Sequence, residues 1–269
     1  MSVSPSMPDF IHPAYLKALG RAMQPAKQQS YDALHLFPGA RVLDVGCGPG
    51  LDAAALAGRV GPEGQVVGVD HDPTMLEHAR AALPPRTNIL FRQADGLALP
   101  FPDGSFDAVR AERVLMHTPD ASRLLAEMLR VTRPGGRVSA MDTDLPPTVD
   151  YASDEVQALD RRITAFQRQQ ASGPTFRGKP GRQLRRLFGE AGLEGVTAEV
   201  IVVPLDAEAL LDTWFTRPEA ALEAGVLTSE EWAAFEAHFR ALDAAGHLFA
   251  YSTVVLAVGR TPEKGAAGQ

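Results

Sequence analysis

The residues with the clearest chemical meaning form a glycine-rich turn after a short apolar run. The run is Val42 to Val45, with Asp44 inside it, and the turn is Gly46-Cys47-Gly48-Pro49-Gly50. Glycine allows a ligand to approach the backbone closely and adopts positive φ without strain. A helix that begins behind such a turn directs unpaired N–H groups at the ligand. The turn is therefore predicted to bind a small molecule through its main chain.

Three kinds of ligand compete for this turn. A mononucleotide loop would end in Gly-Lys-Ser/Thr, and no lysine lies near. The dinucleotide pattern G-x-G-x-x-G/A is met at Gly46 and Gly48, but Leu51 takes its last position. Asp44 would repel a pyrophosphate and would suit an ammonium or sulfonium group. These residues favour a ligand with a cationic end.

A second acidic residue, Asp70, closes the next apolar run, 20 residues after Gly50. In this arrangement an acid at the end of the second strand accepts hydrogen bonds from ribose hydroxyls. The ligand is therefore expected to carry both a ribose and a cationic amino-acid end.

Alternating strands and helices must position these residues. Strands are predicted at Arg41–Gly46, Gln65–Asp70, Ile89–Ala94, Phe106–Ala111 and Arg137–Asp142, and helices at Leu51–Val60, Pro73–Ala82 (with Asp72 as its cap) and Ala121–Thr132. Such alternation indicates βαβ units, a parallel sheet and right-handed crossovers that place helices on both faces.

The pattern changes after Asp144. Residues 145–180 are polar and are expected to be mostly helical, without a strand. Later elements are predicted at Leu184–Ala191 (helix), Val196–Leu205 (strand), Ala207–Ala224 and Ser229–Ala244 (helices) and Tyr251–Val258 (strand). The expected organisation is an N-terminal helical cover (1–38), a cofactor-binding core (39–144), a helical lid (145–181), a completion of the core sheet with late helices (182–260) and a disordered tail (261–269).

Composition narrows the function classes. The 269 residues include 26 basic and 33 acidic side chains, for a net charge of −7, which argues against a nucleic-acid grip built on a basic face. Cys47 is the single cysteine, so neither an intrachain disulfide nor a four-cysteine zinc site can form. No apolar run reaches the roughly 18–20 residues that span a bilayer, and the N-terminus lacks secretory-signal features. We expect a cytoplasmic protein that is a monomer or a homodimer. The residue usage is typical of a bacterial coding bias.

Four motifs in fixed order reveal a family resemblance. They are VLDVGCGPG (42–50), VVGVDHDPTML (66–76), QADGLALPFPDGSFDAVRAERVLMHTPD (93–120) and LLAEMLRVTRPGGRV (124–138). The chain resembles class I S-adenosylmethionine-dependent methyltransferases, in the small-molecule group related to ubiquinone/menaquinone-biosynthesis C-methyltransferases. The resemblance covers about 39–144, with a looser tail to Val258. It implies a doubly wound Rossmann-like α/β sheet of seven strands, mostly parallel with an antiparallel final strand, helices on both faces and a helical cap.

The resemblance also implies which residues hold S-adenosylmethionine, whose spent product is S-adenosylhomocysteine. The methionine end is assigned to the first motif and to the segment after the fourth strand, the ribose to the end of the second strand, and the adenine to residues after the second and third strands. The corresponding residues are Asp44, Gly46, Cys47, Gly48, Gly50, Glu112 and Arg113; Asp70; and His71, Met75, Asp95, Gly96 and Leu97.

Three further residues are candidates for catalysis: His117, Asp142 and Asp144. The resemblance places His117 close to the transferred methyl, where an imidazole could take a proton from a hydroxyl. Asp142 and Asp144 end the fifth predicted strand, at the carboxyl edge where open α/β sheets bind ligands. The alternatives are a capping role for His117 and a solvated strand end for the two aspartates. Because no third ligand can be placed beside them, no metal is expected.

The sequence as a whole predicts a methyltransferase that moves a methyl group from S-adenosylmethionine to oxygen, carbon or nitrogen of a small molecule by in-line displacement. Two alternatives stay open. One is a protein or RNA methyltransferase, which the absence of an Asn-Pro-Pro-Tyr-like motif after the fourth strand disfavours for amino-group methylation of bases and glutamine. The other is an S-adenosylmethionine-binding protein on the same scaffold that transfers no methyl group.

Overall fold

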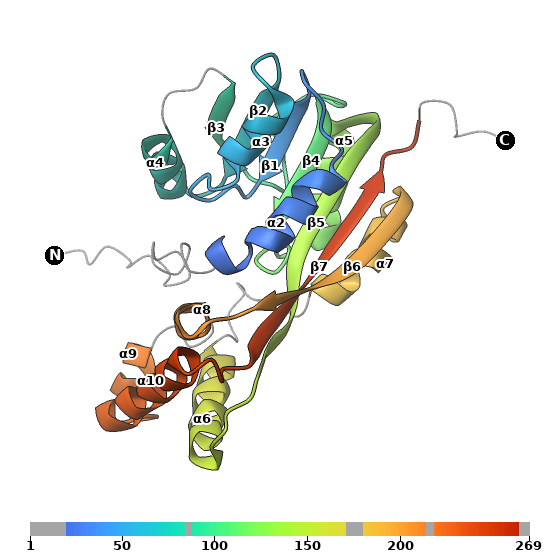
Figure 1. Ribbon diagram of the computed structural model, residues 1–269. Coiled ribbons are helices and arrows are strands. Elements are labelled where there is room, and N and C mark those ends of the chain that lie inside the picture. The colour runs from blue at the N-terminus through green and yellow to red at the C-terminus, as the bar shows by residue number, and fades with distance from the viewer. Residues whose placement is uncertain (1–19, 84–87, 171–179, 214–217, 264–269) are drawn as a thin grey trace. The chain divides into compact units, whose positions relative to one another are not determined.

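The computed structural model describes residues 20–83, 88–170, 180–213 and 218–263 (Figure 1). The elements in chain order are α2 (Gln24–Ala33), β1 (Arg41–Val45), α3 (Ala53–Val60), β2 (Gln65–Asp70), α4 (Pro73–Ala82), β3 (Ile89–Gln93), β4 (Phe106–Glu112), α5 (Ala121–Val131), β5 (Thr132–Val149), α6 (Asp154–Gln170), the 3-10 turn η2 (Gly181–Gln183), α7 (Leu184–Glu190), β6 (Glu194–Pro204), α8 (Ala207–Thr213), α9 (Pro218–Glu223), α10 (Ser229–Ala244) and β7 (Ala250–Arg260).

Seven strands form one sheet in the order β3-β2-β1-β4-β5-β7-β6. The pairs β1–β2, β1–β4, β2–β3 and β4–β5 are all parallel. Strand β7 runs antiparallel to β5. The evidence is a hydrogen bond between the start of one strand and the end of the other: the Gly135 amide near the start of β5 donates to the carbonyl of Thr261 (3.1 Å), just beyond the end of β7. The predicted doubly wound sheet with an antiparallel final strand is thus confirmed.

The described chain divides into two compact units. One contains residues 20–25, 145–170 and 202–253, and the other contains residues 26–144, 180–201 and 254–263, apart from the gaps given above. The second unit holds strands β1 to β4 whole and carries every candidate site residue named from the sequence. The division into cover, core, lid and tail expected from the sequence stays a proposal.

In the second unit the strands bury both faces, and alternation along each strand assigns side chains to one face or the other. Val42, Val66 and Ala108 pack with α2 and α3 on one face, whereas their successors Leu43, Val67 and Val109 pack with α5 and α7 on the other. The same alternation places the side chains of residues 44 and 110 on the α2–α3 face. This assignment decides where the charged groups of the site meet.

The first unit has its own small aromatic core. Phe235 and Phe239 of α10 are fully buried, and their ring centroids lie 4.9 Å apart. The start of α10 is fixed by a capping box, in which the Thr228 hydroxyl accepts from the Glu231 amide and the Glu231 carboxylate accepts from the Thr228 amide. Glu231 also pairs with Arg162 of α6 at 2.6 Å.

The fifth strand differs from its prediction. It runs over Thr132–Val149 rather than Arg137–Asp142, so residues 145–149 are extended where no strand was expected. Prolines and glycines at 134–136 and 146–147 read as chain breakers in the sequence. The structure accommodates the first group in a register shift, where Phe106–Ala108 of β4 face Thr132–Arg137 of β5.

Other helices lie close to their predicted bounds. Helices α8 (Ala207–Thr213) and α9 (Pro218–Glu223) both fall within the helix predicted over Ala207–Ala224, and residues 214–217 between them lie outside the described residues. Helix α3 begins at Ala53, two residues later than predicted. The Asp72 cap of α4 is confirmed, since its carboxylate accepts from the Thr74 amide at 2.8 Å. Of the N-terminal helical cover expected over 1–38, residues 1–19 lie outside the described residues, and the rest contains α2.

Gly68 in β2 offers a test of the packing beneath the glycine turn. A Cβ there would lie 2.8 Å from both Cys47 Sγ and Phe91 Cδ1. We expect Gly68→Ala to lower the free energy of unfolding by about 1–3 kcal/mol through overpacking. Gly58→Ala in α3, where a Cβ meets nothing within 4 Å, should raise it by about 1 kcal/mol. Urea unfolding of both variants measures this, and equal effects would contradict the packing.

Candidate functional site

The glycine turn combines tight packing with one open position. Gly46, Gly48 and Gly50 have φ of +68°, +52° and +72°, values that L side chains rarely adopt. A Cβ at Gly46 would overlap Val114, and one at Gly50 would lie 2.8 Å from Phe91 Cζ. At Gly48 it would meet no atom within 4 Å. The outer glycines thus serve packing, and Gly48 presents bare backbone.

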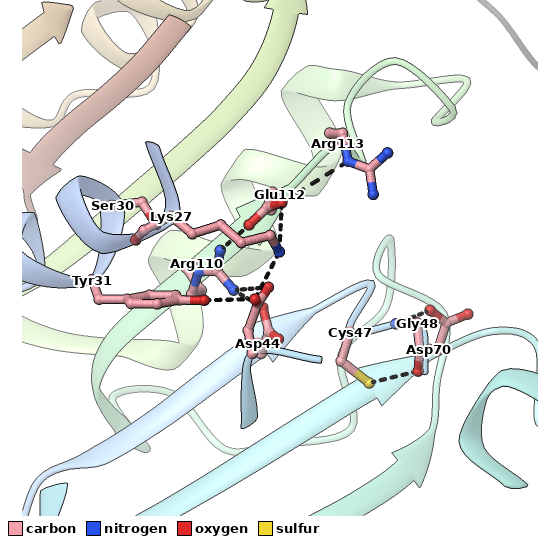
Figure 2. A network of polar contacts seen from close by, with 11 residues as sticks. Lys27, Ser30, Tyr31, Asp44, Cys47, Gly48, Asp70, Arg110, Glu112 and Arg113 are labelled. Carbon is pink, nitrogen blue, oxygen red and sulfur yellow. Dashed lines mark hydrogen bonds and ion pairs between the residues drawn. The ribbon is translucent and has the colours of Figure 1, made fainter. Parts of the chain in front are cut away.

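Asp70 and the turn are joined directly. The carboxylate at the end of β2 accepts from the Gly48 amide at 2.9 Å (Figure 2). It also accepts from the Asp72 amide at 3.0 Å. The Cys47 amide donates to the carbonyl of Val69 (2.9 Å), so the turn lies against the end of β2. Asp70 is 8% exposed, and its orientation is fixed by main-chain donors.

Asp44 belongs to a buried cluster of charged groups centred on Arg110 (Figure 2). Asp44 and Arg110 are direct neighbours in the β1–β4 register, and Arg110 Nη1 lies 3.0 Å from Asp44 Oδ1 and 2.9 Å from Asp52 Oδ2. Arg110 Nη2 lies 2.6 Å from Glu112 Oε2. Lys27 Nζ completes the set, at 2.7 Å from Asp52 and 2.9 Å from Glu112. We call these five side chains the Arg110 cluster.

Burial and charge act against each other in the Arg110 cluster. Burial raises the pKa of Asp44 to about 7, because the opposing effect of Arg110 is weakened by Asp52 and Glu112 nearby. Burial also acts to raise the pKa of Asp52, but Arg110 and Lys27 outweigh it and hold that pKa well below its usual value. Of these two carboxylates, Asp44 is the one whose charge the protein balances less well. A site for an added cation requires such a carboxylate.

Glu112 and Arg113 lie where β4 ends. Glu112 is held by Arg110 and Lys27, and Arg113 Nε lies 3.9 Å from Glu112 Oε1. Arg113 has φ of +54°, a conformation that costs energy in a residue with a side chain, and its amide donates to the carbonyl of Met141 (2.8 Å). Backbone strain of this kind is concentrated at functional sites.

The residues expected around the adenine differ in how far they are exposed to solvent. Met75 is buried, while the His71 side chain is 88% exposed and its Nδ1 lies 3.3 Å from Asp70 Oδ1. Asp95 is exposed and accepts from the Leu97 amide at 2.9 Å, an arrangement typical of an aspartate in a turn. A Cβ at Gly96 would lie 2.9 Å from Leu124 Cδ1 and 3.3 Å from Val45 Cγ1, so the backbone there is closely packed.

The three catalytic candidates have different environments. His117 is exposed, and its amide donates to the carbonyl of Val114 at 3.0 Å. Asp142 is fully buried, and its Oδ2 accepts from the amides of Leu115 (2.9 Å) and Met116 (3.3 Å). Asp144 accepts two side-chain hydrogen bonds from Arg182, at 2.8 and 3.0 Å. Asp142 therefore supports the segment that leads to His117, and Asp144 pairs with an arginine.

Four members of the site escaped the sequence analysis as site residues: Lys27, Tyr31, Asp52 and Arg110. Tyr31 donates to Asp52 Oδ1 at 2.6 Å. One signal could have found the centre of the cluster: Asp44 and Arg110 are opposite charges at inward positions of two apolar strands. Lys27 and Tyr31 lie on a polar helix and give no comparable local signal.

Two absences are worth recording for the described part of the chain. Within it, no three His, Cys, Asp or Glu side chains are grouped to hold a metal ion. Among the helices that the structure describes, none is long and apolar enough to cross a bilayer.

The doubly wound sheet and its cluster of charged groups can be set beside known proteins. Residues 43–140 match the family described as "Methyltransferase domain". An uncharacterised 37.1 kDa protein in transposon Tn4556 of Streptomyces fradiae is 36% identical, covering 94% of this chain and 72% of that protein. The demethylmenaquinone methyltransferase of Shouchella clausii is 33% identical over 60% of this chain and 73% of its own length. The chain spans about half of some other relatives, including 46% of the demethylmenaquinone methyltransferase of Lactococcus lactis, at 44% identity over 42% of this chain.

Solved structures share the fold. The phosphoethanolamine N-methyltransferase 2 of Haemonchus contortus, solved in complex with S-adenosyl-L-methionine, has a TM-score of 0.61 at 18% identity, covering 97% of this chain and 61% of that chain. The chain belongs to the class I S-adenosylmethionine-dependent methyltransferases, and S-adenosylmethionine is the cofactor of this family.

The buried Asp142 gives a pH-dependent test. Burial raises its pKa to about 7, although the Met116 and Leu115 amides act to lower it. The folded protein therefore holds this proton more tightly than the unfolded chain, whose pKa is near 3.8. Its contribution to stability must fall as pH rises from about 4 to about 7, by at most roughly 1.4 kcal/mol per pH unit, and stay level above that.

Asp142→Asn keeps an acceptor oxygen for both amides and removes the titration. We expect the difference in unfolding free energy between wild type and variant to decline over that window only. Urea unfolding at a series of pH values measures it, and parallel curves from pH 4 to 8 would show that Asp142 does not titrate there.

Proposed function

We propose that this protein transfers the methyl group of S-adenosylmethionine to a small-molecule acceptor. The observation that carries the proposal is the convergence of an open glycine turn, Asp70 and the Arg110 cluster at the carboxyl ends of β1, β2 and β4. That edge is where doubly wound sheets bind their ligands.

The residues present fit the cofactor. Gly48 has room beside its backbone, and Asp70 is held at the strand end by amides that ribose hydroxyls can supplement or replace. Asp44 and Glu112 belong to a cluster with three carboxylates and two buried cations, Lys27 and Arg110, among its described members. We assign the ammonium end of the cofactor to Asp44 with the turn Gly46 to Gly50 and to Glu112 with Arg113. Its ribose is assigned to Asp70 and its adenine to His71, Met75 and Asp95 to Leu97.

The bound cofactor supplies a methyl group on a sulfonium, which is already reactive toward a nucleophile. The work of the protein is then to fix the position of donor and acceptor and to exclude water. The carboxylates hold the positively charged limb of the donor, and the rigid glycine turn sets its distance from β4. Alignment of this kind alone can contribute about 7 kcal/mol or more to lowering a barrier.

On the acceptor side we assign His117 as the group that orients the acceptor or accepts its proton. Asp142 acts through the backbone, because it holds the amides of Leu115 and Met116 just before His117. Asp144 is assigned to the same edge of the sheet, where both of its carboxylate oxygens accept hydrogen bonds from Arg182.

The acceptor class is proposed from two facts. The net charge of −7 is unfavourable for RNA or DNA, and curated relatives include demethylmenaquinone methyltransferases. A quinone, polyketide, sugar or similar metabolite is the proposed acceptor, and a cytoplasmic monomer or homodimer is the proposed form.

Asp70 tests the donor site. We expect Asp70→Asn to weaken binding of S-adenosylhomocysteine by about 1–3 kcal/mol, because charge-assisted hydrogen bonds to the ribose are lost. Asp72→Asn is the matched control: it removes the same charge two residues away, and asparagine keeps the cap of α4. Titration calorimetry measures both, and equal losses would remove Asp70 from the ribose site.

His117 tests the acceptor side. If it accepts a proton, His117→Ala should slow turnover by about 100-fold or more while donor affinity stays within twofold. The comparison variant is His78→Ala, which removes another exposed histidine, from α4. The assay follows labelled methyl over a metabolite panel by mass spectrometry. Tight donor binding without transfer to any acceptor would favour the non-methylating alternative.

A further inference from the structure

Two side chains of α2 enter the Arg110 cluster from outside the sheet. Lys27 is only 4% exposed, which is rare for lysine unless its charge is paired, and its ammonium bridges Asp52 (2.7 Å) and Glu112 (2.9 Å). The Tyr31 hydroxyl donates to Asp52 Oδ1 at 2.6 Å (Figure 2). Helix α2 is also tied to α3 at the surface by Asp32 and Arg59 (2.9 Å).

The contacts of Lys27 and Tyr31 lead to Asp44 through shared groups. Asp52 and Asp44 accept from the same Arg110 nitrogen, Nη1, and Glu112 accepts from Nη2. The Tyr31 ring also lies against the guanidinium, with its centroid 5.3 Å from Arg110 Cζ. A guanidinium fixed at both nitrogens leaves its third partner, Asp44, little freedom of position.

We infer that Lys27 and Tyr31 are positioning residues of the donor site, which set the place and the charge of Asp44 through Asp52, Glu112 and Arg110. The inference rests on the proposed function, in which Asp44 receives the ammonium of the donor. Neither residue is assigned a contact with the donor itself. By linkage, donor binding and the docking of α2 then stabilise one another.

The charges around Asp44 determine how the loss of Lys27 would affect the charge of Asp44. The charged groups that face Asp44 are Lys27 from α2, Asp52 before α3, and Arg110 and Glu112 from β4, with Arg113 beyond Glu112. Lys27 acts to lower the pKa of Asp44, which burial raises to about 7. Its removal leaves three carboxylates around Arg110 and must raise that pKa further. A protonated Asp44 has no charge to offer an ammonium.

The test is the pH dependence of donor-site affinity, measured by calorimetry with S-adenosylhomocysteine between pH 6 and 9 for wild type, Lys27→Met, Lys27→Arg, Tyr31→Phe and Asp32→Asn. For Lys27→Met we expect affinity about tenfold below wild type near pH 6.5, with the ratio returning toward one near pH 9, because a shift of one pKa unit changes the ionised fraction about tenfold. Lys27→Arg should restore most of the affinity. Tyr31→Phe should show a smaller shift in the same direction.

Asp32→Asn is the control, since it removes the surface tie between α2 and α3 and leaves the cluster intact. It should weaken the docking of α2 by no more than about 1 kcal/mol without moving the pH profile. A Lys27→Met profile parallel to wild type, or one matched by Asp32→Asn, would overturn the inference. Wild type that fails to bind S-adenosylhomocysteine at any pH would instead overturn the proposed function. Should Lys27→Met not fold, Tyr31→Phe and Lys27→Arg decide the question by the same profile.

Discussion

The structure of the site depends on one buried guanidinium. Arg110 is 1% exposed, and a charge so far from water is tolerable only when its donors are paired. Its partners come from three places: Asp44 directly opposite it in the β1–β4 register, Glu112 two residues along its own strand, and Asp52 at the start of α3. Because Arg110 needs all of these partners, it fixes the register of β1 and β4 and holds both strands against the start of α3. The glycine turn lies between β1 and α3.

The parts of the site that have a local signature in the sequence could be predicted from it. The turn Gly46 to Gly50 needs positive φ, and the acids at strand ends follow from the topology, so both could be predicted from spacing. The Arg110 cluster could not, because Lys27 and Asp44 are joined through space and not through any repeat. Even Asp52, which falls inside the helix predicted over Leu51–Val60, makes no capping bond and instead contacts Lys27, Tyr31 and Arg110.

The fold was predictable to the same extent and for the same reason. The βαβ alternation predicted the parallel sheet. The length of β5, in contrast, depends on pairing with residues that are distant in the sequence. Pro134 and Gly135 would end an isolated strand, but a register shift against β4 and hydrogen bonds to Thr261 carry the strand past them. Likewise Asp142 and Asp144 lie two residues apart within β5 yet differ in role, because one faces the Leu115 and Met116 amides and the other faces Arg182. Such partners are supplied by tertiary structure.

The division of the chain into two units has a practical consequence for anyone dissecting it. The boundaries near residues 144, 201 and 253 fall inside β5, β6 and β7, and the one near residue 25 falls inside α2. Domains are ordinarily joined by exposed linkers that can be cut or respliced. Chimeras made at these four points would sever hydrogen-bonded segments instead of loops. Exchange of acceptor preference between relatives is therefore better attempted by grafting individual side chains than by swapping whole segments.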